Sequence, residues 1–366
     1  MRRFLRFLLL KPILWGAKKF DSDPDKIRVF DALTKLFNRI LDEPGKLGPL
    51  IDFDPQTDKY IIFSDQHKGA RNGADDFILA APTYVAALHY YNQKGFNFIN
   101  LGDCEELWEN TLSRVKKWNA EQFEAEKAFV QRKAFIKVIG NHDLYWGNDP
   151  LARLELETIF GAKIKACEGV VLRTNIAGTA LRIFCTHGHQ GDVNSDGNWF
   201  TKFFISKIWG PLQSYLQINP NEPSNNDYKK TLHNEIMYEW SSEQEHIVLI
   251  TGHTHQPVFE SLTHIERLYR QMALAKAGAD TAALDQIRKE TAPFQKRFDA
   301  LVLDYSKILP TYFNSGCCCF SDGDITGIEI ESGQIRLIKW ETKGNDPGRT
   351  VLEEMPLTDL VAAITK

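Results

Sequence analysis

Histidines, carboxylates and one asparagine follow five short apolar runs of this chain, and all three side-chain types bind metals. The runs are Tyr60–Phe63, Phe96–Leu101, Phe135–Ile139, Leu181–Cys185 and Ile247–Ile250. The polar residues that follow them are Asp65, His67, Asp103, Asn141, His187, His253 and His255. Seven ligands are too many for one tetrahedral site, but they suit two ions that share a carboxylate. Mixed nitrogen and oxygen donors without thiolate favour manganese, iron or zinc over calcium or magnesium.

The spacing of these residues predicts that they converge. Asp65 and His67 are two residues apart, as are His253 and His255, and alternate residues of an extended segment point to the same side. In open α/β sheets the carboxyl ends of the strands form the ligand crevice. We therefore expect the five polar clusters to meet at one place.

Helical and extended patterns alternate around these clusters. The residue pattern of Asp76–Asn92 and roughly of Ser113–Lys133 has the periodicity of a helix, and both segments lie between the first apolar runs. Strand–helix alternation of this kind predicts an α/β sheet. The alternating segments Ile325–Ile330 and Ile335–Trp340 predict further strands, in a second sheet against the first.

The polar clusters also form an ordered series of motifs that resembles the calcineurin-like metallophosphoesterases. That family carries D-x-H, G-D-x-x-D/E, G-N-H-D/E, H and G-H-x-H in this order. The corresponding blocks here are Asp65-Gln66-His67, Gly102-Asp103-Cys104-Glu105-Glu106, Gly140-Asn141-His142-Asp143, His187 and Gly252-His253-Thr254-His255. The segment Tyr312–Gly316 resembles the strand that follows the last motif in the family. The resemblance implies a two-sheet α/β/β/α sandwich with helical insertions.

The resemblance also implies a role for each motif residue. One metal ion would be held by Asp65, His67 and His255, and the other by Asn141, His187 and His253, with Asp103 bridging both. The ions would be manganese in the first instance, with iron or zinc as alternatives.

Such a pair of ions implies a hydrolase that cleaves a P–O bond of a phosphomonoester, phosphodiester or pyrophosphate with a metal-bridging hydroxide. His142 is then the proton donor or charge stabiliser near the leaving group, and Glu106 orients it.

Some of these residues also have purely structural explanations. A lone histidine at a strand end is usually structural, but six of the ten histidines fall inside the ordered motifs. His189 is either an outer-shell residue or a substrate contact. Lys68 and Arg71 are expected either to meet a substrate phosphate or to be solvated loop charges. The run Cys317–Cys319 is interpreted first as packing of small residues, with metal binding or lipid attachment as alternatives.

Composition excludes several classes of protein. The chain of 366 residues has 44 basic and 48 acidic side chains, a formal charge of −4 and a pI near 6.2, so no nucleic acid is expected as a partner. Six cysteines, three of them adjacent, do not suggest a disulfide framework and favour a reducing, cytoplasmic setting. No apolar run approaches the roughly 20 residues needed to span a bilayer.

The chain divides into three expected parts. Residues 1–48 form a basic and apolar helical appendage, residues 49–345 a metallophosphoesterase domain, and residues 346–366 a C-terminal helix. Two insertions interrupt the domain: an aromatic lid at 196–220 and a helical hairpin at 261–309 with its turn near 277–280. The appendage is expected either to lie on an anionic membrane surface, at the inner face, or to dock on the body of the protein.

The substrate is a phosphate ester whose leaving group the motifs leave open. The bacterial UDP-2,3-diacylglucosamine hydrolases are a related branch, since an apolar helical roof follows their equivalent of His187, and Trp199 and Phe203 would belong to such a roof here. The position of this roof makes a lipid-linked pyrophosphate hydrolase, peripheral to the membrane, one alternative. The chain departs from that branch at His142, where the branch usually has arginine. A non-catalytic scaffold with the same fold is another alternative.

Overall fold

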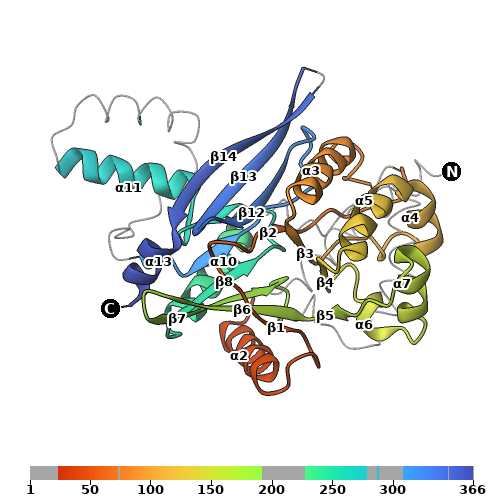
Figure 1. Cartoon of the computed structure of the whole chain (residues 1–366). Helices are drawn as coiled ribbons and strands as arrows, with labels where there is room; N and C mark the ends of the chain where they lie inside the picture. Colours follow the sequence, from red (N-terminus) through yellow and green to blue (C-terminus); the bar gives the residue numbers. More distant parts are fainter. Residues whose placement is uncertain are drawn as a thin grey trace, which may run out of the picture.

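Two seven-stranded sheets lie face to face, with helices on their outer faces (Figure 1). This computed structural model describes residues 24–72, 75–191, 227–277, 287, 308–344 and 346–365. The expected aromatic lid, with Trp199 and Phe203, lies outside the described residues. So does nearly all of the expected hairpin beyond residue 277.

The first sheet carries the early motifs. Its strand order is β14 (Asp346–Pro356), β13 (Gln334–Lys343), β12 (Ile325–Glu331), β2 (Tyr60–Phe63), β3 (Asn97–Leu101), β4 (Phe135–Val138) and β5 (Ala166–Cys167). Strands β2 to β5 are parallel to one another, whereas β12, β13 and β14 pair antiparallel. The ends of β2, β3 and β4 therefore lie along one edge of this sheet.

The second sheet carries the later motifs. Its order is β1 (Leu50–Asp52), β6 (Gly169–Ile176), β7 (Thr179–Thr186), β8 (Ile247–Thr251), β11 (Tyr312–Asn314), β9 (Val258–Phe259) and β10 (Leu262–Thr263). Strands β7, β8 and β11 are parallel. Strands β6 and β7 form a hairpin whose turn residues, Ala177 and Gly178, both have positive φ, as a two-residue type I′ turn requires.

Three apolar layers hold the sheets and helices together. Between the sheets, Ile62, Ile99 and Val138 of the first sheet pack with Ile183 and Ile250 of the second. The helices α3 (Ala81–Gln93), α4 (Leu112–Trp118), α5 (Ala120–Gln131), α6 (Tyr145–Asn148) and α7 (Ala152–Phe160) lie on the side of the first sheet. Further helices cover the outer face of the second sheet. The expected α/β/β/α sandwich is confirmed.

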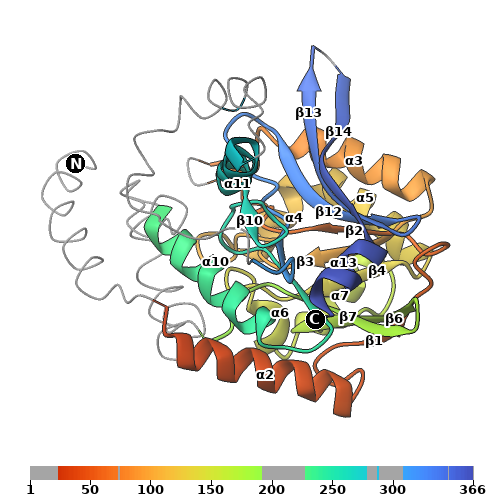
Figure 2. The ribbon, with the colours of Figure 1, turned by 90° about the vertical axis from the view of Figure 1, so that its left-hand side faces the viewer.

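Helix α2 (Lys26–Asp42) packs on the outer face of the second sheet, together with α10 (Asp227–Ser242) (Figure 2). Asp25 caps its first turn by accepting from the backbone amides of Ile27 and Arg28. The ring of Phe37 packs against Phe184 of the sheet and Trp240 of α10. We expected residues 1–48 to be an appendage. Their described part docks on the body of the protein, one of the two placements expected, and forms an outer layer of the sandwich because its apolar face is buried on β6 and β7.

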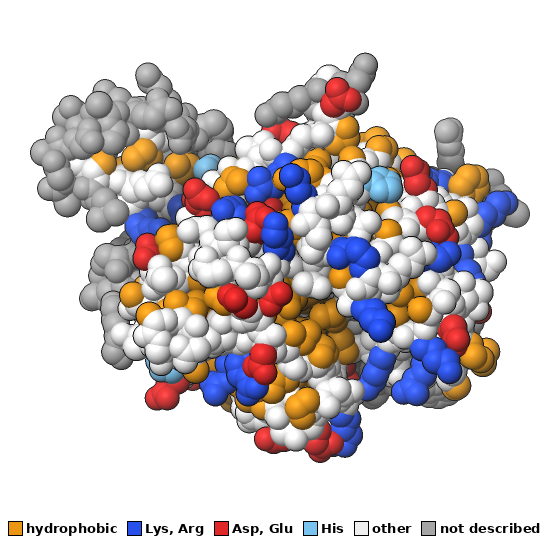
Figure 3. All heavy atoms as spheres, in the orientation of Figure 1, with side chains coloured by type: hydrophobic (Ala, Val, Ile, Leu, Met, Phe, Trp, Pro, Cys, Tyr) orange, Lys and Arg blue, Asp and Glu red, His pale blue; other side chains and the backbone are white. Residues whose placement is uncertain are grey.

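The C-terminal segment differs from the expectation of a single helix. Residues 346–356 form strand β14, paired along its length with β13, and only Leu357–Ile364 is helical, as α13. In the expected hairpin, α11 (His264–Ala277) is the first helix. Among the described residues, no helix combines the length and apolarity that a membrane span requires. Acidic, basic and hydrophobic side chains are interspersed on the face shown in Figure 3.

Candidate metal centre

Loops after three parallel strands of the first sheet and two of the second bring the seven expected ligands together. Asp65 and His67 follow β2, Asp103 follows β3, Asn141 follows β4, His187 follows β7, and His253 and His255 follow β8. All seven are largely buried. The two sheets therefore contribute to one cluster, from neighbouring strand ends.

The first group of ligands consists of Asp65, His67 and His255. The Nε2 atoms of the two histidines are 3.1 Å apart. Oδ1 of Asp65 is 3.2 Å from Nε2 of His255 and 3.9 Å from Nε2 of His67. Three donor atoms face the same small volume, as one metal ion would require.

The second group consists of Asp103, His187 and His253, with Asn141 beside them. Nε2 of His187 is 3.2 Å from Oδ2 of Asp103 and 3.1 Å from Oδ1 of Asn141. Its Nδ1 lies 2.9 Å from the carbonyl oxygen of Leu101. When Nδ1 donates a proton to this carbonyl, Nε2 keeps the lone pair that a metal ligand needs.

Asp103 lies between the two groups. Its Oδ2 is 3.7 Å from Nε2 of His67 in the first group and 3.2 Å from Nε2 of His187 in the second. Its Oδ1 accepts a hydrogen bond of 2.8 Å from the backbone amide of His142. A Cβ on Gly140 would collide with Asp103, so only glycine fits beside this carboxylate.

Five of the seven residues have left-handed backbone conformations. Their φ angles are 54° for Asp65, 50° for His67, 50° for Asp103, 69° for His253 and 56° for His255. Positive φ is uncommon for residues with a Cβ, although aspartate, asparagine and histidine adopt it more often than most. Such strain persists only where the surroundings hold it, and it concentrates at functional sites.

His142 is placed beside the two groups by Glu106 and Trp108. Its Nδ1 is 2.6 Å from Oε2 of Glu106, which is also 3.2 Å from Nδ1 of His67. The indole of Trp108 stacks on the His142 ring, with centroids 4.1 Å apart and planes 17° from parallel. One carboxylate thus orients both a proposed ligand and the proposed proton donor.

The charges around His142 favour its protonated form. Burial lowers the pKa of His142, but the carboxylates of Glu106 and Asp103 outweigh burial and raise it to about 9. Burial raises the pKa of Glu106, whereas the charge and hydrogen bond of His142 lower it to about 2. An imidazolium paired with a carboxylate can donate a proton or stabilise negative charge.

The remaining ligands show the same balance of burial and charge. Burial raises the pKa of Asp103, but His187 and His142 hold it well below its usual range. The pKa of His253 is well below its usual range because of burial and the nearby His233 and His187. Asp103 is therefore ionised and His253 neutral, the forms in which these side chains bind metals.

Charged residues lie behind the ligands of the first sheet, and they correct one expectation. Lys68 is fully buried and its ammonium pairs with Glu105, at 3.1 Å, and with Glu126. Glu105 also pairs with Lys137 at 2.8 Å. Asp143 accepts from the backbone amides of Gly140 and Cys104. Lys68 was a candidate substrate contact; that prediction is wrong, because its charge is buried and already neutralised.

Neutral groups lie behind the ligands of the second sheet. The side-chain amide of Asn314 donates to the carbonyl of Gly252 at 2.7 Å and to Oγ1 of Thr251 at 3.1 Å. Asp65, although it follows β2 of the first sheet, is also held by neutral groups: the hydroxyl of Ser64 donates to it and is 2.7 Å from that of Ser315. The sequence pattern singles out the segment Tyr312–Gly316 but predicts no role for Asn314 and Ser315 in supporting the ligands.

The structure also describes two other expected substrate contacts, Arg71 and His189, and they differ in exposure. Arg71 is exposed, with its backbone amide bonded to Oδ2 of Asp75 at 2.7 Å. His189 is 5% exposed, and its ring centroid is 5.4 Å from that of His187. His189 therefore lies next to the second group, where both of its expected roles are compatible with its position.

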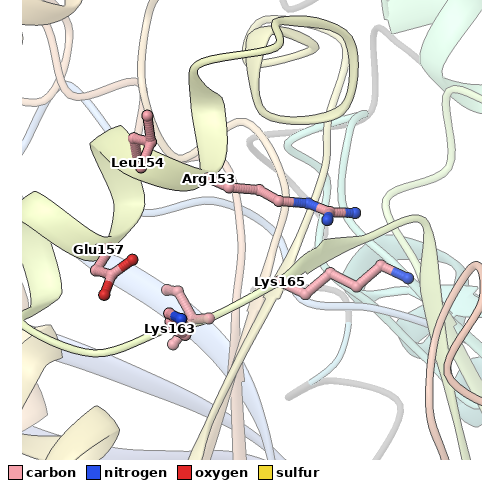
Figure 4. Close-up of a pocket in the computed structure, with 6 residues that line it drawn as sticks. Arg153, Leu154, Glu157, Lys163 and Lys165 are labelled. Carbon is pink, nitrogen blue, oxygen red and sulfur yellow. The ribbon is translucent and has the colours of Figure 1, made fainter.

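One pocket lies elsewhere on the molecule, at α7 and the segment after it (Figure 4). Its volume is about 480 Å³, and Arg153, Leu154, Glu157, Lys163, Ile164 and Lys165 line it. None of these belongs to the motif series. This pocket is therefore separate from the metal centre.

Comparisons with known proteins bear on the identity of the chain. Three solved structures are similar in part. The match to a predicted phosphoesterase from Streptococcus pneumoniae has 12% sequence identity and a TM-score of 0.30. It covers 80% of this chain and 97% of that protein. The match to vacuolar protein sorting 29 from Cryptosporidium parvum has 11% sequence identity and a TM-score of 0.34. It covers 82% of this chain and 98% of that protein. The match to Vps29 from Entamoeba histolytica has 11% sequence identity and a TM-score of 0.30. It covers 81% of this chain and 99% of that protein.

The search of curated proteins gives no match. The sequence model of the calcineurin-like phosphoesterases matches residues 59–257, more than half of the chain, and this range contains the whole motif series. The chain is therefore a member of the calcineurin-like phosphoesterase family.

Proposed function

We propose that the protein is a dimetal-dependent phosphoesterase that hydrolyses a P–O bond. The observation that supports this most is the position of Asp103, between two groups of donors that each suit one transition-metal ion. Asp65, His67 and His255 would hold one ion, and Asn141, His187 and His253 the other. When bound, the two ions activate water near neutral pH and neutralise the charge of a phosphate.

The residues around the ions have separate tasks in this proposal. His142 gives a proton to the leaving oxygen or stabilises its charge, and Glu106 fixes the ring of His142 so that Nε2 faces the reacting bond. Glu106 holds His67 in the same way. The substrate is a phosphate ester, and manganese is the expected metal.

Two variants test the proposal. Asp103→Asn should lose both metal ions and all turnover, because its carboxylate is the ligand that the two groups share. His142→Ala should keep two metal equivalents and lose about 10²- to 10⁴-fold in turnover, as expected for a general acid. Elemental analysis and hydrolysis of bis(p-nitrophenyl) phosphate with manganese measure these effects. His264, which is exposed at the start of α11, supplies the matched control His264→Ala.

The outcome also separates the alternatives. Two bound metals with no turnover of monoesters, diesters or pyrophosphates would favour the scaffold. A preference for a lipid-linked pyrophosphate over soluble nucleotides would favour the amphiphilic substrate. At most one metal equivalent in metal-replete wild-type protein contradicts the dimetal proposal.

A further inference from the structure

Two cysteines face the metal centre from the loop after β11. Sγ of Cys319 is 3.7 Å from Nδ1 of His255. The ligand atoms of Cys317, Cys319 and His255 all lie within 4.8 Å of one another. Nε2 of the same imidazole ring faces Asp65 and His67. His255 thus presents one nitrogen to the proposed dimetal centre and the other to a pair of thiols.

The surrounding hydrogen bonds fix this loop. The backbone amide of Thr326 donates to the carbonyl of Cys317 at 3.0 Å, and that of Cys318 donates to the carbonyl of Asp65 at 3.2 Å. The side chain of Cys318 points elsewhere, into the core between the first sheet and α3, with its Sγ 3.9 Å from the carbonyl of Thr326. The first and third cysteines therefore share a side, as alternate residues of an extended segment do.

One separation matches that of a metal site, and the other two lie within the 4.8 Å that the three ligand atoms share. Zinc bonds of about 2.3 Å to sulfur and about 2.0 Å to nitrogen, at a tetrahedral angle, place the two ligand atoms roughly 3.6 Å apart. The Cys319–His255 distance is close to this value. Two cysteines and one histidine form a ligand set of zinc sites that keep a fourth position open. Thiolates also select zinc over manganese and magnesium.

We propose that Cys317, Cys319 and His255 form a separate binding site for Zn²⁺, adjoining the dimetal centre and sharing the ring of His255 with it. Access comes from the side of Cys319 and His255, which are both partly exposed. Cys317 closes the inner side of the site, at 1% exposure. Binding of the ion releases the protons of both thiols, and the two thiolates balance its charge. While Nε2 of His255 also binds an ion of the dimetal centre, Nδ1 gives up its proton as well and the ring is an imidazolate.

Cobalt is the probe for this site, because Co²⁺ bound to thiolate gives a charge-transfer band in the near ultraviolet. The dimetal centre has only nitrogen and oxygen donors, so cobalt bound there gives no such band. Titration of the reduced, chelator-treated full chain should produce the band, and added Zn²⁺ should remove it. Cys317→Ser and Cys319→Ser should each abolish it, whereas Cys318→Ser, the matched control, should retain it.

Further variants tie the band to the site and separate it from the proposed function. His255→Ala should shift half-saturation to higher cobalt, and an unchanged titration would remove the histidine from the site. Asp103→Asn should keep the band, so failure of the dimetal centre leaves this test intact.

Two results would overturn the proposal. One is the absence of a band in reduced wild-type protein. The other is a band that survives in both Cys317→Ser and Cys319→Ser. If peptide mass spectrometry instead finds a Cys317–Cys319 disulfide and the reduced protein takes up no cobalt at the thiols, the pair is a redox couple and not a zinc site.

Discussion

Two ligands of the first sheet, Asp103 and Asn141, have buried ion pairs behind them, whereas the ligands of the second sheet rest on neutral hydrogen bonds. Behind Asp103 and Asn141 lie fully buried charged side chains, namely Lys68, Glu105, Glu126, Lys137 and Asp143. Behind His253 and His255 lie the amide of Asn314 and the hydroxyls of Thr251, Thr254 and Tyr312. When a buried ion pair is broken, an uncompensated charge remains in the protein interior. When a neutral hydrogen bond is broken, only an unsatisfied polar group remains, which costs less stability. The two halves of one site should therefore tolerate substitution very differently.

The largest effect is expected at Lys137, whose ammonium is 2.8 Å from Glu105 and 3.9 Å from Asp143. Lys137→Met should lower the free energy of unfolding by about 3–5 kcal/mol, because it leaves the buried carboxylates of Glu105 and Asp143 with only the charge of Lys68 to offset them. Chemical denaturation measures this loss. The half-exposed pair Lys116–Glu155 has the same 2.8 Å separation, and Lys116→Met should cost less than about 1 kcal/mol. Equal losses in the two variants would contradict the comparison.

A double variant sharpens the same point. Adding Glu105→Gln to Lys137→Met removes one excess negative charge of the single variant and leaves Lys68 paired with Glu126. The free energy of unfolding should recover in part relative to the single variant, as a non-additive double-mutant cycle. Purely additive losses would mean that the two side chains do not depend on each other.

A smaller effect is expected at Asn314 on the neutral side. Asn314→Ala removes the donor to the Gly252 carbonyl, which should cost about 1–3 kcal/mol of unfolding free energy. The exposed Asn148, whose side chain donates to a backbone carbonyl at 3.0 Å, is the control, with Asn148→Ala expected within about 0.5 kcal/mol of wild type. A loss at Asn314 as large as that at Lys137 would remove the distinction between the two supports.

The smallest effect is expected at Trp108, which stacks on His142. An aromatic pair of this kind contributes about 0.5–1.5 kcal/mol, so Trp108→Leu should slow turnover by about 2- to 13-fold if His142 acts as proposed. Metal content should stay unchanged. The exposed Trp118 provides the control Trp118→Leu. Equal rates in the two variants would show that the stack does not position His142.

The sequence predicted the ligand cluster because its evidence is local. Each motif follows an apolar run, and the runs correspond to β2, β3, β4, β7 and β8 within one or two residues at either end. The short strands β1, β5, β9 and β10 were not predicted, since two or three residues carry no periodicity. Residues 346–356 were predicted to be helical, but they form a strand because they pair with β13 along their length.

The supports behind the ligands could not be predicted in the same way, because their partners are distant in the chain. Lys68 and Glu126 are 58 positions apart, and Asn314 lies 62 positions from Gly252. One error was avoidable. If alternate residues share a side, Lys68 points away from His67 and Asp65, toward the interior. The charge of Lys137 within an apolar strand was a second sign of a buried ion pair.

The left-handed backbone at Asp65, His67, Asp103, His253 and His255 determines how mutagenesis of this centre can be interpreted. Replacement by asparagine or glycine keeps a residue that accepts positive φ, so a lost activity then reports on a lost ligand. Replacement by valine or threonine demands a conformation that β-branched side chains avoid, and the loop itself would rearrange. Random libraries should therefore recover asparagine and glycine at these positions far more often than residues of similar polarity but branched shape.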